Sequence, residues 1–137
     1  MLTAVRRGPV ADRKSFGRRG VVGRLDRARL GRETLRDYYE PYLRSAAEHD
    51  AGFVLESPTW RASPRWASEL GYSDDDLDRL NRKAIGLMEE LREEFELEAA
   101  PFVISGCIGP QDDGYSPKTK LSADEAQEYH LTQINTF

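Results

Sequence analysis

The sequence predicts an α/β fold with the element order α-β-α-β-α. Two short, unbroken apolar runs are expected to form buried strands, and such runs are typical of parallel strands covered on both faces. The expected connections from helix into strand are short, at 49–51 and 98–100, whereas those out of the strands are long, at 57–73 and 106–121. Long loops after the strands are typical of (β/α) barrels, whose active sites form at that end. An open doubly wound sheet shows a similar asymmetry, so loop length leaves both architectures open.

The first half of the expected fold contains a helix, a strand and a short second helix. Apolar residues recur at helical spacing over 32–48, and Pro41 is expected to kink this helix or to begin its second half. The apolar run at 52–55 predicts a short buried strand. Residues 63–70 predict a weak helix that stops at Gly71.

The second half contains a long helix, a strand and a final helix. Ser73 is expected to cap the long helix. The apolar face of that helix consists of Leu77, Leu80, Ala84, Leu87, Met88, Leu91 and Phe95. The run at 101–104 predicts the second strand. Ser122 and Glu125 form a capping-box signature for a final helix, which we expect to run to the last residue.

The charge of the chain is divided unevenly. Residues 1–25 hold seven basic residues and one acidic residue, a net charge of +6, whereas the rest of the chain carries −10. Such a segment can be an organellar transit segment, a contact for nucleic acid or another polyanion, or a solvated tail. Phe16 is its one aromatic residue, which disfavours stacking on bases. We expect residues 1–31 to be a basic, disordered head. We expect no contact between the protein and nucleic acid.

Length, hydropathy and cysteine content limit the class of protein. The 137 residues fit one domain. No apolar run is long enough to span a membrane. Cys107 is the single cysteine and cannot form an internal disulfide, and no second Cys or His lies at metal-ligand spacing from it. These features favour a protein of the reducing cytoplasm that has no membrane partner.

Four segments of the chain carry motifs that occur in the same order in a known family. They are LRDYYEPYL at 35–43, FVLESPTWRAS at 53–63, VISGCIGPQDDGYSP at 103–117 and SADEAQEYH at 122–130. These segments resemble the first long helix, the second strand with its loop, the third strand with its Gly-x-Ile/Val-Gly-Pro turn, and the following helix of the homocysteine S-methyltransferase family. The resemblance implies that residues 32–137 are the N-terminal part of a homocysteine-binding (β/α)8 barrel of the TIM type.

The same resemblance implies an activity and a metal. Members of the family transfer a methyl group to the thiol of homocysteine and so form methionine. Their zinc ion is held by three cysteines and activates the thiol, because zinc lowers the pKa of a bound thiol until the nucleophilic thiolate persists at neutral pH. The methyl donors of the family include sulfonium compounds, betaine and folate–cobalamin systems.

The chain also departs from the family. Residues 1–31 contain no Asp-Gly-Gly turn of the kind that ends the family's first strand, and Cys107 stands at a turn position that is not a zinc-ligand position in the family. Two strands do not close a barrel, so we expect a chain cut at its C-terminal end. We expect a truncated, inactive methyltransferase-like protein with no catalytic residue, no metal ligand and no bound cofactor. The alternative is a non-enzymatic half-barrel that associates with another chain, or with itself, through its uncovered strands.

Five residues at the ends of the two strands are the candidates for binding a small-molecule substrate. Glu56 could bind a substrate ammonium group or pair with Arg61, and Ser57 with Thr59 could hydrogen-bond substrate or form a local turn. Two more candidates, Gly106 and Cys107, follow the second strand. Gly106 could let the backbone approach a ligand or only shape a turn, and Cys107 could line a thiol pocket or be a small buried apolar residue.

Overall fold

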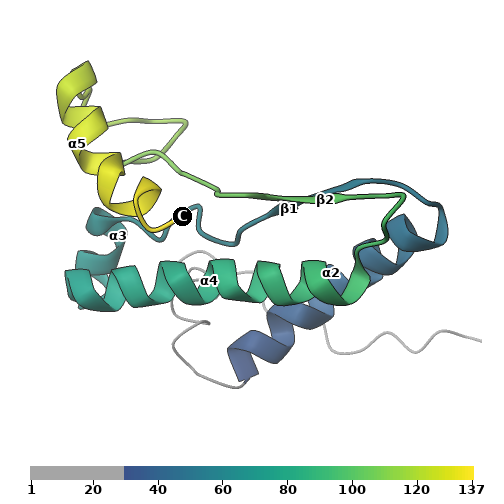
Figure 1. Ribbon diagram of the computed structural model, residues 1–137. Helices are drawn as coiled ribbons and strands as arrows, with labels where there is room; N and C mark the ends of the chain where they lie inside the picture. The colour runs from purple at the N-terminus through teal and green to yellow at the C-terminus, as the bar shows by residue number, and fades with distance from the viewer. Residues whose placement is uncertain (1–29) are drawn as a thin grey trace, which may run out of the picture.

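The structure of the protein is a computed structural model, and it describes residues 30–137. The prediction of a basic head at 1–31 therefore falls almost wholly outside the described residues. Figure 1 shows the elements in chain order. They are α2 (Leu30–Glu48), β1 (Phe53–Glu56), α3 (Pro64–Glu69), α4 (Asp74–Phe95), β2 (Phe102–Ser105) and α5 (Ala123–Ile134). The predicted alternation of helices and strands is confirmed.

Strands β1 and β2 lie side by side and are parallel, with Phe53 opposite Phe102 and Glu56 opposite Ser105. Each strand begins and ends one residue later than the apolar run predicts. The reason is that the hydrogen-bond ladder continues past the apolar residues, since the Ser57 N–H donates to the Ser105 carbonyl at 2.8 Å. The described residues thus form a mixed α/β structure with a two-stranded sheet, and a closed barrel remains a prediction.

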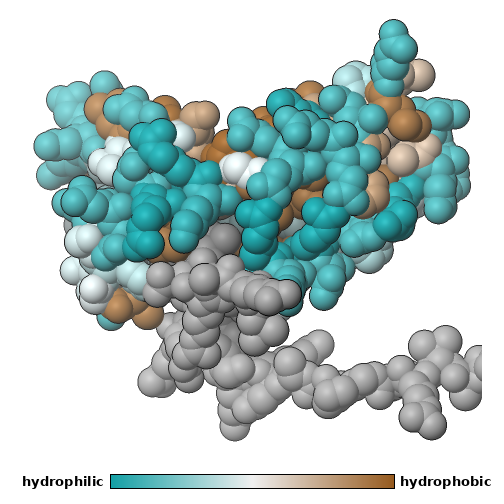
Figure 2. Space-filling model, turned by 60° about the horizontal axis from the view of Figure 1, so that its bottom comes forward, coloured by the Kyte–Doolittle hydropathy of each residue, from teal (hydrophilic) through white to brown (hydrophobic). Residues whose placement is uncertain are grey.

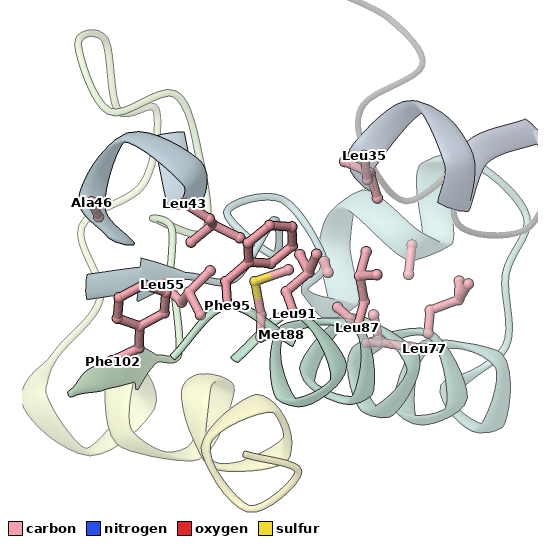
Figure 3. Packing of buried hydrophobic residues seen from close by; sticks show 14 residues of the cluster. Leu35, Leu43, Ala46, Leu55, Leu77, Leu87, Met88, Leu91, Phe95 and Phe102 are labelled. Atoms are coloured by element: carbon pink, nitrogen blue, oxygen red, sulfur yellow. The ribbon is translucent and has the colours of Figure 1, made fainter. Parts of the chain in front are cut away.

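Helices α2 and α4 lie on the same side of this sheet (Figure 1). Helix α4 contacts both strands and α2, and its apolar face supplies the centre of the core. Figure 3 shows these side chains converging from α4, α2 and the strands. Eight buried residues come from α4, and they are Leu77, Leu80, Asn81, Ala84, Leu87, Met88, Leu91 and Phe95. The predicted apolar face of this helix is confirmed.

The two faces of the sheet differ. Leu55 is fully buried on the helix side. Its neighbour Val54 is 63% exposed and lies opposite Val103, which is 59% exposed. Because side chains alternate along a strand, these two valines share the face that points away from α2 and α4. That face is open in the part of the chain that the structure describes.

The ends of the helices follow the predicted capping signals. Ser73 and Asp76 form a capping box on α4, and Ser122 and Glu125 form one on α5. Gly71 follows α3 with a φ of +79°, a left-handed conformation that favours glycine. The expectation that the final helix runs to the last residue is wrong. Helix α5 ends at Ile134, and the Asn135 N–H closes its last turn on the Leu131 carbonyl at 2.8 Å.

The outer surface of the helix layer is largely polar, as Figure 2 shows from below. Two ion pairs, Arg32 with Glu90 and Arg36 with Glu94, join α2 to α4 across this surface. Exposed pairs of this kind contribute about 0–1 kcal/mol each, so the apolar contacts beneath them hold the two helices together. No helix of residues 30–137 is both long and apolar enough to cross a membrane.

Candidate substrate site at the carboxyl ends of the strands

The five predicted site residues all lie at one edge of the sheet. Glu56 is the last residue of β1 and faces Ser105, the last residue of β2. The two long loops therefore begin next to each other, although residues 57 and 107 are 50 positions apart in the sequence. The structure thus brings the three predicted residues at and after the end of β1 next to the two that follow β2.

A closed ring of hydrogen bonds joins the two loops. The Cys107 N–H donates to Ser57 Oγ at 2.9 Å, and the Thr59 hydroxyl donates to the Cys107 carbonyl at 2.7 Å. Ser57 Oγ and Thr59 Oγ1 lie 2.7 Å apart. Because the single hydroxyl proton of Thr59 is already used, Ser57 must donate in this last bond. The ring fixes both polar groups of the Cys107 backbone.

This ring determines what Ser57 and Thr59 can do. Ser57 is 3% exposed and Thr59 is fully buried. Both hydroxyls are engaged with each other and with Cys107, so a direct hydrogen bond to a substrate would require the ring to open. Their clearest role in the structure is to set the path of the chain after β2.

The thiol of Cys107 is held in its protonated form. The residue is 9% exposed, and burial raises the pKa of the thiol to about 11, with a further contribution from its hydrogen bond to Glu56 and from the charge of that carboxylate. Since the thiolate is the nucleophile and the metal-binding form, Cys107 at neutral pH is neither. It lines the strand end as a small, weakly polar side chain.

Glu56 presents its side chain to solvent at the same edge. The alternative interpretation, a pair with Arg61, is not realised among the described residues, since the Arg61 guanidinium lies instead over the Trp66 ring, 4.4 Å from its centroid. The carboxylate is therefore available to a ligand, and among the described residues its charge acts on the side chains of Cys107 and Tyr39.

Helix α2 also reaches this edge through Tyr39, which sequence reasoning treated only as part of an apolar helix face. The Tyr39 hydroxyl donates to the Glu56 carbonyl at 2.7 Å. Burial raises its pKa to about 12, and the nearby charges of Tyr38, Glu56 and Cys107 act in the same direction. The residue was missed because the spacing that places it on α2 does not show what lies opposite its hydroxyl.

Two buried amides connect the same edge to α4 and α5, and sequence reasoning missed both. Gln133 donates to the Thr59 carbonyl at 2.9 Å and to Asn81 Oδ1 at 3.2 Å. Asn81 in turn donates to the Ala62 carbonyl at 3.0 Å. Each residue is 1% exposed, and Gln133 Oε1 has no hydrogen-bond partner within the described residues. The sequence could have indicated both residues, because each is a polar residue at a position on the buried face of its helix.

The loops make two further contacts across the edge. A Cβ placed on Gly109 would lie 1.9 Å from the Trp60 carbonyl oxygen, so the two backbones approach closely there. Asp112, which is 8% exposed, pairs with Arg65 at 2.7 Å and accepts from the Lys118 N–H at 2.8 Å. The backbone N–H of Lys118 is the largest cause of the lowered pKa of this carboxyl. Hydrogen bonds, an ion pair and a close backbone approach thus join the segments around the strand ends, where the Glu56 carboxylate stays exposed.

Within residues 30–137, no cluster of three or more His, Cys, Asp or Glu side chains could hold a metal ion. The groups at this edge are suited to binding a small molecule. They are the Glu56 carboxylate, which can bind a cation, the Gly106 backbone, which no side chain of its own covers, and the protonated Cys107 thiol.

The family model described as Homocysteine S-methyltransferase matches residues 13–137, which correspond to a partial region of that family. Comparison with the curated proteins and with the solved structures gave no match.

Proposed function

Because the chain belongs to the homocysteine S-methyltransferase family, we propose that the carboxyl ends of β1 and β2 bind homocysteine. The observation that carries this proposal is the convergence of Glu56, at the end of β1, with Gly106 and Cys107, directly after β2, at one edge of the sheet. In parallel α/β folds, ligands bind outside the carboxyl ends of the strands.

The open face of the sheet supports the corresponding architecture. We propose that β1 and β2 are neighbouring strands of a (β/α)8 barrel whose helices lie on the side of α2 and α4. Inward positions of such barrels are filled mainly by bulky, branched side chains. Val54 and Val103 are of this type and share the face away from the helices.

The site residues suit an amino acid with a thiol group in different ways. The exposed Glu56 carboxylate provides a partner for the ammonium group, and the charge-assisted hydrogen bond it offers is stronger than a neutral one. Gly106 has no side chain, so a ligand that displaces the overlying Phe137 ring could approach the backbone there. The neutral Cys107 side chain provides a polarisable contact. Ser57 and Thr59 act behind these groups by fixing the Cys107 backbone.

The residues present do not fit the zinc ion of the family. The sequence contains one cysteine, whereas the resemblance implies three, and no cluster of three or more His, Cys, Asp or Glu side chains in residues 30–137 could hold a metal ion. We therefore derive no catalytic step for this chain. The proposed function is binding of the methyl acceptor, without methyl transfer by this chain alone.

Replacing Glu56 tests the proposed binding mode. Glu56→Gln is expected to weaken binding of L-homocysteine about tenfold, because a charged hydrogen bond of about 1.5 kcal/mol is lost. The matched control is Glu98→Gln, an exposed carboxylate that precedes β2 and so lies toward the opposite end of that strand. Isothermal titration calorimetry on the three proteins measures the affinities. Equal affinity in Glu56→Gln and the unmodified chain would contradict this mode of recognition.

A second candidate function is association with another chain, and the exposed Val54–Val103 pair favours it. In that case Val54→Lys, which places a charge on the open face, should shift a defined oligomer to monomer in sedimentation velocity. Glu98→Lys serves as the charge control. A chain that is monomeric before any substitution removes this candidate.

A further inference from the structure

The aromatic ring of Phe137 rests on the end of β2. A Cβ built on Gly106 would lie 2.2 Å from Phe137 Cδ2 and 2.6 Å from Cε2. The ring therefore occupies the space where any other residue at position 106 would have its side chain. This is the same strand end at which the homocysteine site is proposed, and Figure 1 shows the chain after α5 returning to it.

The segment that carries the ring is anchored at its base. Gln133 donates to the Thr59 carbonyl at 2.9 Å. Thr136 donates to Asp78 Oδ1 at 2.9 Å and lies 2.8 Å from the Thr132 carbonyl. Both residues are buried, at 1% and 8% exposure. The turn after α5 is thus held against α4 and against the loop that follows β1.

The ring itself is held by apolar contacts and not by hydrogen bonds. Phe137 is 39% exposed, and its N–H donates to the Ile134 carbonyl at 3.2 Å. Because a phenyl ring makes no hydrogen bonds, the ring can leave Gly106 without breaking the buried hydrogen bonds of Gln133 and Thr136, although it then exposes the apolar surface that it now buries. A hydrogen-bonded segment that carries an apolar ring over Gly106 has the form of a lid.

We propose that Phe137 is a lid on the carboxyl end of β2, which closes over Gly106 and must move aside before a ligand reaches the backbone there. The identity of that ligand as homocysteine rests on the proposed function, whereas the lid itself rests on the Phe137–Gly106 contact. A ligand and the ring would compete for the same space, so the closed lid lowers the affinity for the ligand.

Alkylation of the single cysteine tests the lid without any ligand. Cys107 follows Gly106 directly, so opening the strand end should expose its thiol to iodoacetamide. Phe137→Ala is expected to react about threefold faster or more at fixed pH than the unmodified chain. The matched control is Ile134→Ala, which removes another exposed apolar side chain, 47% exposed, from the same helix end. Equal rates in Phe137→Ala and the unmodified chain would overturn the lid.

Two further measurements separate the possible failures. Each protein is also alkylated in denaturant, and a variant whose rate in buffer equals its rate in denaturant has unfolded. If Phe137→Ala unfolds, Phe137→Leu replaces it, and we again expect faster alkylation than in the unmodified chain. Affinity for L-homocysteine should rise in Phe137→Ala. If neither protein binds homocysteine while Phe137→Ala is alkylated faster, the proposed ligand is wrong and the lid stands. If the unmodified chain binds homocysteine and the two alkylation rates are equal, the lid is wrong and the site stands.

Discussion

Gly109→Ala is expected to lower the free energy of unfolding by about 3 kcal/mol. The added Cβ would lie 1.9 Å from the carbonyl oxygen and 2.9 Å from the carbonyl carbon of Trp60. These are backbone atoms, so no side-chain rotation relieves the overlap, and one of the two loops must move. That movement would also strain the hydrogen-bond ring at Cys107, two residues away.

Gly86→Ala is the matched control for this substitution. Gly86 lies inside α4, and nothing lies within 4 Å of a Cβ built there. Alanine is favoured over glycine in a helix by about 0.5–1 kcal/mol, so this variant should be slightly more stable than the unmodified chain. Urea denaturation of the three proteins gives the comparison. A loss of less than about 0.5 kcal/mol in Gly109→Ala would show that the loops do not approach as the structure describes.

Leu55→Ala is expected to destabilise the chain by about 2–5 kcal/mol. Leu55 is fully buried between β1 and the helices and belongs to the main core cluster. Removing its side chain leaves a cavity in addition to the lost burial. Since a domain of this size has a total stability of about 5–15 kcal/mol, this loss is a large share of the total, and both the melting temperature and the urea midpoint should fall.

Val54→Ala provides the comparison on the same strand. Val54 is 63% exposed on the open face of the sheet, so its replacement should cost less than about 1 kcal/mol, which is the range of strand propensity. Thermal and urea unfolding of both variants measure the difference. Equal losses would mean that the face of Val54 and Val103 is covered, contrary to the arrangement described above.

Much of the fold could be predicted from local signals. The capping residues Ser73 and Ser122 identified the starts of two helices, and the two apolar runs identified both strands to within one residue. Capping boxes and apolar runs are local in sequence, so a single chain is sufficient to detect them. The strand limits moved because the Ser57–Ser105 hydrogen bond joins residues that no local pattern connects.

The location of the five candidate residues was predicted better than the contacts that they make. The five predicted residues do lie at one edge, because parallel strands bring their carboxyl ends together. The ring that engages Ser57 and Thr59 was not predicted, nor were the contributions of Tyr39 and Gln133. These contacts depend on how helices pack against the strand end, and residues 59 and 133 are 74 positions apart. Helical spacing predicts which face a residue occupies and not its partner across the core.

The most direct test of the proposed homocysteine site is an NMR titration of the 15N-labelled chain with L-homocysteine. The account predicts progressive, saturable shifts of the backbone amides at the two strand ends, centred on Glu56, Gly106 and Cys107. L-Alanine, which has the amino-acid groups without the thiol side chain, should shift the Cys107 amide less at the same concentration. Shifts confined to the outer surface of α2 and α4, or no shifts at all in the folded chain, would contradict the assignment of this edge as a homocysteine-binding site.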